Sequence, residues 1–193
     1  MPTLTLTQIA LLAIVTVAGI IDWKTKKIFN VITFPAALLG IVLNGLVGGW
    51  PAALMAVAGW ILAVAIMVLP DHVIMKRPKM YFGDAKLMAA IGAFQGPGGM
   101  LMTFFYFSLI YGLITTVKVG PLLYKVLAKP SNADADEDIV AYNQAKQAKI
   151  PLGPSIAVGT ALSIFLREPT LNLFGFHDTT IGGMPMVLAM FGL

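Results

Sequence analysis

Residues 31–69 read VITFPAALLGIVLNGLVGGWPAALMAVAGWILAVAIMVL and contain no charged side chain. A helix needs roughly 20 apolar residues to cross about 30 Å of hydrocarbon, and this stretch offers that length twice. Trp50-Pro51 interrupts it, because proline lacks a backbone N–H and is poorly tolerated inside a helix. The stretch therefore predicts two membrane-spanning helices, Val31–Gly49 and Ala52–Leu69, joined by a short turn.

Apolar stretches on both sides of this segment predict further spans. The sequence Gly-Pro-Gly-Gly at Gly96–Gly99 marks a second turn between two of them. We expect an all-α, polytopic transmembrane helical bundle of about six spans, with residues 1–193 forming one membrane-embedded domain. The segment Gly175–Leu193 fits either an interfacial or re-entrant segment or one more crossing. The additional predicted spans are Leu4–Ile21, Met80–Phe94, Met100–Val117 and Leu152–Leu166.

Composition supports a membrane protein and argues against several kinds of site. The chain is 58% hydrophobic and 11% charged, whereas soluble domains carry about 25% charged residues. It has no cysteine, which excludes disulfides and thiolate metal ligands. Its two histidines, His72 and His177, are far apart in sequence, which makes a zinc site improbable. We expect no metal and no cofactor.

The distribution of the basic residues predicts the orientation in the membrane. With the N-terminus outside, 12 of the 13 lysines and arginines fall on the inner side, and Arg167 alone falls outside. The positive-inside rule favours this arrangement. The net charge of +4 then reflects topology, and we expect no nucleic-acid partner. The polar stretch at about 119–150 is predicted to be a cytoplasmic loop.

Asp22 and Asp84 are acids that the sequence places at the edge of the membrane. Asp22 follows the first apolar run, and Asp84 lies near the start of the fourth. Two spans separate them, so both are expected at the cytoplasmic side. From Asp84 to the turn at Gly96 is about 12 residues, or roughly 18 Å of helix, which predicts that Asp84 lies below the membrane surface. An ordinary helix cap at Asp84 and an interfacial residue at Asp22 are the alternative interpretations.

Two carboxyl groups at close range do not both ionise cheaply, so one keeps a proton and the other stays charged. A pair in this state hydrolyses amides in aspartic peptidases. The N-terminus of a helix favours an anion, which favours the ionised role for Asp84. Because such a pair titrates jointly, the sequence leaves open which aspartate is the base and which is the acid.

Three motifs resemble those of type IV prepilin peptidases. Residues 22–30, DWKTKKIFN, resemble the D-x-R-x-x-x-I-P-N stretch of that family, and residues 81–87, YFGDAKL, resemble its G-x-G-D-x-K-L stretch. Residues 150–154, IPLGP, resemble its I-P-x-G-P element. The departures are Lys24 in place of arginine, Phe29 in place of proline and Tyr81 in place of glycine. Both aspartates are retained.

The resemblance implies a membrane aspartic peptidase with Asp22 and Asp84 as its catalytic pair. Its substrate would be a prepilin or pseudopilin, whose leader is removed at the cytoplasmic face of the bacterial inner membrane. The short, cysteine-free chain is similar to the peptidase-only members associated with Tad/Flp-type pili, so methylation by this chain is doubtful. Glycine-aspartate motifs also occur in presenilin-type and archaeal preflagellin peptidases. Substrate-binding or supporting roles would fall to Lys24, Asn30, Gly83 and Lys86.

Other interpretations of the same residues remain open. Lys86 is also typical of a lysine that extends to the membrane interface, Asn30 of a helix cap, and Gly153-Pro154 of a start to the last span. The whole chain could be a non-catalytic subunit of a pilus or secretion assembly, or a proton- or cation-coupled transporter. A groove between the first and fourth spans is our expectation for substrate access. The oligomeric state is not predicted.

Overall fold

The computed structural model describes residues 4–69, 82–128, 140, 151–167 and 169–170. Regular structure within these ranges is helical and includes no strand, as the apolar runs predict. The helices are α1 (Leu6–Thr25), α2 (Asn30–Leu69), α3 (Phe82–Ala128) and α5 (Gly153–Phe165). The predictions that concern Tyr81, His72, most of the loop at 129–150 and the segment Gly175–Leu193 lie outside the described residues.

Helix α1 begins at a capping box and ends just beyond Asp22. The N–H of Gln8 donates to the Thr5 hydroxyl, and the N–H of Thr5 donates to the Gln8 side chain. At the other end Lys26 is left-handed, with φ of 55°, and its N–H donates to the Asp22 carbonyl at 2.8 Å. Asp22 therefore lies in the last turn of α1.

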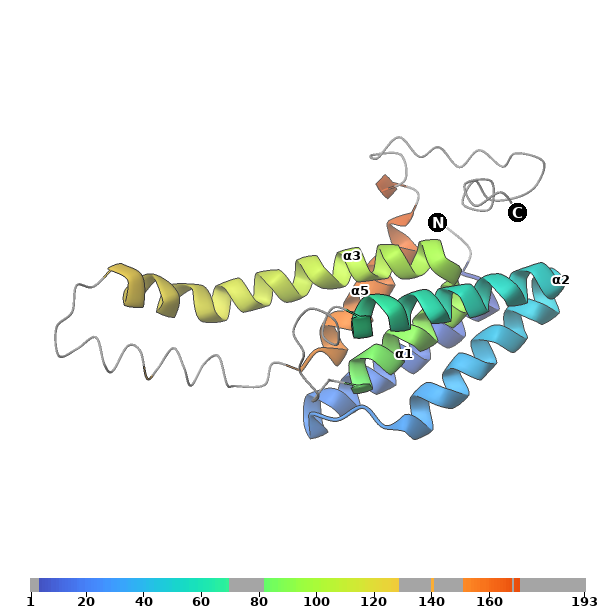
Figure 1. The fold of residues 1–193 in the computed structure, drawn as a ribbon, viewed down its shortest axis with the longest axis horizontal. Helices are drawn as coiled ribbons and strands as arrows, with labels where there is room; N and C mark the ends of the chain where they lie inside the picture. The colour runs from blue at the N-terminus through green and yellow to red at the C-terminus, as the bar shows by residue number, and fades with distance from the viewer. Residues whose placement is uncertain (1–3, 70–81, 129–139, 141–150, 168, 171–193) are drawn as a thin grey trace.

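Helices α2 and α3 each double back on themselves at a glycine (Figure 1). Gly49 has φ of 71° and Gly96 has φ of 69°, values that only glycine adopts without strain. Each glycine is followed within two residues by a proline, Pro51 or Pro97, which suits the first turn of the returning limb. Both turns predicted from the sequence are thus present, and each helix forms two limbs.

Helices α1, α2 and α3 are, within the described ranges, each long and apolar enough to cross a membrane. Helix α5 has 13 residues, or roughly 20 Å of length. Large apolar side chains such as Val31, Leu38 and Val47 are exposed on the outside of the bundle, which is expected where lipid is the solvent. The protein is therefore a membrane protein, while the total of about six spans and the outside N-terminus stay predictions.

The second limb of α3 is longer than the sequence pattern predicted. The predicted span ends at Val117, and the predicted loop begins at about 119, but the helix continues through Pro121 to Ala128. The pattern marked the end of the apolar run at Lys118. A charged side chain ends an apolar run without ending a helix, because lysine is a good helix former.

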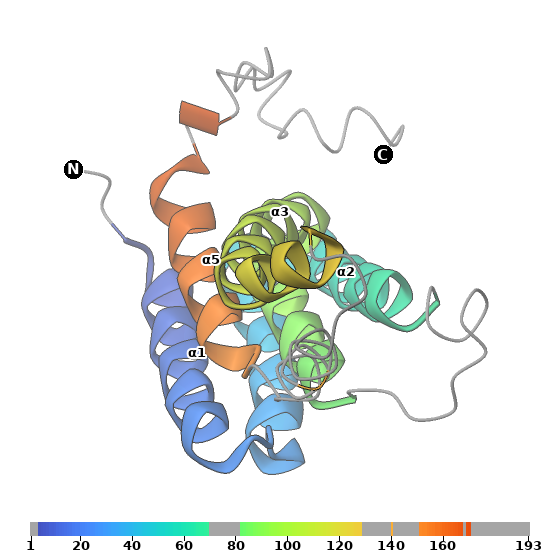
Figure 2. The same cartoon turned by 90° about the vertical axis from the view of Figure 1, so that its left-hand side faces the viewer.

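The first limb of α3 forms the centre of the bundle. Its residues from Asp84 to Phe94 are buried except Lys86, with Leu87, Met88 and Ile91 fully enclosed. Figure 2 shows α3 between α2 on one side and α5 on the other, with α1 beside α5. Asp84 consequently lies on the most buried limb of the described fold.

A polar cluster attaches α5 to the bend of α3. The hydroxyl of Thr103 donates to Gln95 Oε1 at 3.0 Å and lies 2.8 Å from the Ser163 hydroxyl. Thr103 and Ser163 are buried, and hydrogen bonds between polar side chains are a common means of joining helices in membranes. The cluster fixes the position of α5 along α3, and with it the position of the α5 N-terminus.

Candidate active site

Asp22 is held at the junction of α1 and α5. Its side chain is 5% exposed, and its Oδ2 atom accepts a hydrogen bond of 2.9 Å from the backbone N–H of Gly153. Gly153 is the first residue of α5. Pro154 follows it, and the fixed φ of proline favours a helix start at this point. A buried carboxylate thus meets the N-terminus of a helix that lies 131 residues further along the chain.

Asp84 lies in the first turn of α3 and is 7% exposed. Helices α1 and α3 are in contact, and the two carboxyl groups are near enough to interact electrostatically. Among the described residues no side chain or N–H is recorded as a hydrogen-bond donor to that carboxyl. The fold therefore brings both carboxyl groups to one buried place.

The link between α1 and α2 packs against the start of α3. A Cβ atom at Gly83 would lie 3.2 Å from the Ile28 Cβ, so glycine allows the link to approach closely. Lys86 Nζ donates to Asn30 Oδ1 at 2.8 Å and lies 5.4 Å from the centre of the Phe34 ring. The side chain of Asn30 thus braces α2 against α3. Residues 22–30, 83–87 and 151–154 meet around the two aspartates.

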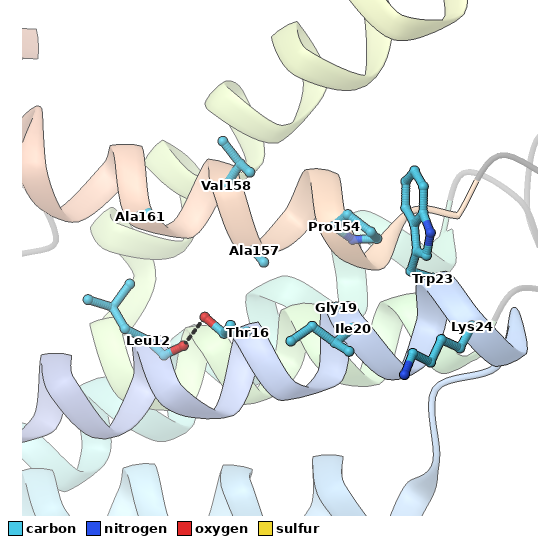
Figure 3. Close-up of a pocket in the computed structure, with 10 residues that line it drawn as sticks. All are labelled: Leu12, Thr16, Gly19, Ile20, Trp23, Lys24, Pro154, Ala157, Val158 and Ala161. Carbon is cyan, nitrogen blue, oxygen red and sulfur yellow. Dashed lines mark hydrogen bonds between the residues drawn. The ribbon is translucent and has the colours of Figure 1, made fainter.

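An apolar groove of about 440 Å³ runs between α1 and α5 (Figure 3). Its floor contains small residues such as Gly19, Ala157 and Ala161, which leave space between the helices. The exposed side chains of Trp23 and Lys24 form one end of the groove (Figure 3). The remaining lining residues are Leu12, Thr16, Ile20, Pro154 and Val158.

The groove differs from the one expected between the first and fourth spans, because it lies between the first and the last. Asp22 does not line it. Successive helical residues point about 100° apart, so Trp23 lines the groove while the Asp22 side chain points to its buried contact with Gly153. Among the predicted site residues Lys24 alone borders the groove, whereas Asn30, Gly83 and Lys86 lie around the aspartates.

Gly153 is the residue whose importance the sequence understated. The pattern Gly-Pro before an apolar run predicted the start of a span, and the structure adds a bond from that start to Asp22. The third motif carried a signal for this contact, because it shares a family pattern with the two aspartate motifs. The residues next to Gly153 in the sequence give no indication that its contact is Asp22.

The sequence model of the type IV leader peptidase family matches residues 9–116. The chain belongs to this family. The match covers most of α1, all of α2 and most of α3, and it includes Asp22 and Asp84. No match was found among curated proteins or among solved structures. Membership indicates a leader-peptidase type of protease, as the three motifs had suggested.

In this leader peptidase family member, the matched region supplies both carboxyl groups, and α5 lies beyond it. Within the described ranges no three histidine, cysteine, aspartate or glutamate side chains gather as a metal-binding group. The groups present at the junction of the three motifs are two carboxyls, backbone N–H groups and the amine of Lys86. These groups are suited to acid–base catalysis of hydrolysis.

Proposed function

We propose that this leader peptidase is an aspartic endopeptidase whose catalytic groups are the carboxyls of Asp22 and Asp84. It removes the basic leader from a type IV or Flp-type prepilin or pseudopilin at the cytoplasmic face of the bacterial inner membrane. The single observation that carries the proposal is that two buried carboxyl groups interact although they come from helices that are far apart in the sequence. Burying a charge is costly, so two such groups at one place favour a functional explanation.

The chemistry requires one charged and one protonated carboxyl. The charged group takes a proton from water as the water oxygen attacks the scissile carbonyl carbon, and the protonated group donates its proton to the carbonyl oxygen. The resulting diol loses the amine when the first group returns its proton to nitrogen and the second takes one from a diol hydroxyl. Both carboxyls then regain their initial states.

Supporting roles are proposed for the residues that surround the pair. Gly83 keeps the α1–α2 link close to the start of α3, and the bond from Lys86 to Asn30 maintains this arrangement. Lys24 is exposed at the end of the groove. In this proposal its ammonium group binds an acidic group of the substrate and takes no part in the hydrolysis itself.

Replacement of either aspartate by asparagine tests the proposal. Asp22→Asn and Asp84→Asn keep the side-chain shape and remove the ability to exchange a proton, so each should reduce leader removal by at least about a thousandfold. The assay follows conversion of a prepilin co-reconstituted with the full-length protein in lipid vesicles. Asp71 lies outside the three motifs, so Asp71→Asn serves as the control and should leave the rate unchanged.

The same assay separates the proposal from its alternatives. If both asparagine variants accumulate in the membrane and still release the leader, the two aspartates are not catalytic. A non-catalytic subunit of a pilus or secretion assembly would then explain the chain better. Proton flux across the vesicles that depends on the aspartates, in the absence of cleavage, would instead support a transporter.

A further inference from the structure

Gly153 occupies a position where any larger residue would displace Asp22. A Cβ atom at Gly153 would lie 2.7 Å from the Asp22 Cβ and 3.0 Å from its Oδ2. Both residues are buried, and the N–H of Gly153 already donates to that oxygen at 2.9 Å. The contact is therefore specific to a residue that has an N–H and no side chain.

The first turn of α5 directs this donor at the carboxylate. Leu152, the residue before the helix, forms no side-chain cap, and Pro154 has no N–H to contribute. The N–H of Gly153 is the donor from this end of α5 that bonds to Asp22. In its own helix Asp22 lies in the last turn, where backbone carbonyls disfavour an anion. Its charge consequently depends on α5.

Asp84 has a different environment. It is 7% exposed and lies on the buried limb of α3, and among the described residues no group donates a hydrogen bond to its carboxyl. Its place in the first turn of α3 favours an anion through the helix dipole. A direct bond from an N–H to a carboxylate is the stronger effect. The comparison therefore favours the charge on Asp22, the reverse of what the dipole alone predicts.

Within the described helices, the other charged groups do not alter this comparison. Neither α2 nor α5 contains a charged residue. Near the pair, α3 contributes Asp84 and Lys86, of which Lys86 is bonded to Asn30. The lysines at this end of α1 are exposed, so solvent screens their effect. They are Lys24 in its last turn, Lys26 at its C-cap and Lys27 after it.

We infer that the N-terminus of α5, through the backbone N–H of Gly153, holds Asp22 as the charged member of the pair. This inference rests on the proposed function and assigns its two roles. Asp22 takes the proton of the attacking water, and Asp84 donates a proton to the carbonyl oxygen. The return steps then follow: Asp22 protonates the leaving nitrogen, and Asp84 recovers a proton from the diol. Gly153 is a positioning residue, because it acts through Asp22.

The test removes one N–H without adding a side chain. Cell-free synthesis with glycolic acid at position 153 replaces the amide by an ester in the full-length protein, which is then reconstituted in vesicles with a prepilin. We expect kcat to fall about tenfold to a hundredfold, with KM changed less than about twofold. The acidic limb of the kcat/KM profile should move to higher pH, because the anion of Asp22 loses its donor.

A second ester provides the matched control. The ester at 153 also weakens the Leu152 carbonyl, which accepts from the Ile156 N–H at 2.9 Å. The hydroxy-acid analogue of isoleucine at position 156 breaks that same bond and leaves Gly153 N–H in place. It should leave the pH profile unchanged. An equal loss of rate with both esters, or an unshifted profile with the ester at 153, would overturn the inference.

Infrared spectroscopy identifies the protonated carboxyl independently of turnover. At neutral pH the carbonyl band of a carboxylic acid should be present in the wild type and absent in Asp84→Asn. A band that persists in Asp84→Asn and disappears in Asp22→Asn would assign the roles the other way. If Asp22→Asn abolishes cleavage while the ester at 153 does not affect it, the inference fails and the proposed function stands.

Discussion

At the scale of single residues, the site depends on two glycines that are packed too tightly to accept a side chain without a shift of their neighbours. Asp22 is enclosed by Gly153, and the α1–α2 link approaches Gly83 through Ile28. Each glycine permits a contact between segments that are distant in the chain. The geometry of the carboxyl pair is therefore set by the absence of side chains as much as by the acids themselves.

Gly153→Ala should impair the peptidase without unfolding it. The added Cβ would lie 2.7 Å from the Asp22 Cβ, so α5 or Asp22 must shift. We expect a loss of about 1–3 kcal/mol in the free energy of unfolding and at least about a tenfold fall in leader cleavage. Thermal unfolding in detergent and the vesicle assay measure the two effects. An alanine variant with the full cleavage rate would contradict the proposed closeness of Gly153 and Asp22.

At the scale of secondary-structure elements, the two bent helices α2 and α3 are joined by a close backbone crossing. A Cβ at Gly92 would lie 2.3 Å from the Gly59 carbonyl oxygen, a separation at which only glycine fits. Small residues at helix crossings stabilise membrane proteins because they allow backbones to approach. This crossing holds the buried limb of α3, and Asp84 with it, against α2.

Gly92→Ala and Gly112→Ala form a matched pair of substitutions within α3. The first inserts a methyl group into the crossing and should lower the free energy of unfolding by about 1–3 kcal/mol. The second meets no atom within 4 Å and should be neutral or stabilising by up to about 1 kcal/mol, because alanine favours helix. Unfolding in denaturing detergent compares them. Equal changes in the free energy of unfolding for the two variants would show that α2 and α3 are not in close contact at Gly92.

Asn44, on the first limb of α2, supports the same buried limb of α3. Its Nδ2 lies 2.9 Å from the Gly40 carbonyl oxygen and 3.0 Å from those of Ala93 and Phe94, all in hydrogen-bond contact. The carbonyls of Ala93 and Phe94 lie just before the bend at Gly96. At the end of a helix limb such carbonyls have no backbone N–H of the same limb to accept from. Asn44→Leu should therefore lower the free energy of unfolding by about 1–3 kcal/mol. The same detergent unfolding assay measures it, and an unchanged midpoint would count against the bond.

At the scale of the whole molecule, orientation in the membrane decides whether the carboxyl pair faces the cytoplasm. The exposed residues Leu38, Leu46 and Val47 on α2, with Leu109 and Leu113 on α3, form surface that water would not stabilise. The basic residues then set the direction of insertion. Six crossings with the N-terminus outside would place Asp22 and Asp84 at the inner leaflet.

Cysteine labelling tests this orientation directly, since the natural chain contains no cysteine. Trp50, at the bend of α2, and Lys27, after α1, are both exposed. In intact cells an impermeant maleimide should label Trp50→Cys and should label Lys27→Cys only after the membrane is permeabilised. Labelling of Lys27→Cys from outside would reverse the orientation and would contradict cleavage at the cytoplasmic face.

The helical class, both bends and the placement of each aspartate at the end of a helix are predictable from the order of the amino acids. These features follow from solvation and local backbone geometry: apolar runs seek lipid, and Gly49 and Gly96 adopt a backbone conformation that other residues avoid. The end of α3 was predicted less well, because a lysine ends an apolar run without ending a helix.

Which helix ends meet is a property of the packed bundle. No local sequence pattern predicts three of the contacts described above. They are the bond from Gly153 to Asp22, the bond from Lys86 to Asn30, and the groove between α1 and α5. In lipid the packing of helices depends on small residues and a few polar bonds rather than on a hydrophobic stripe. Such contacts are fixed by shape across the whole bundle, and they appear only when the helices are placed together.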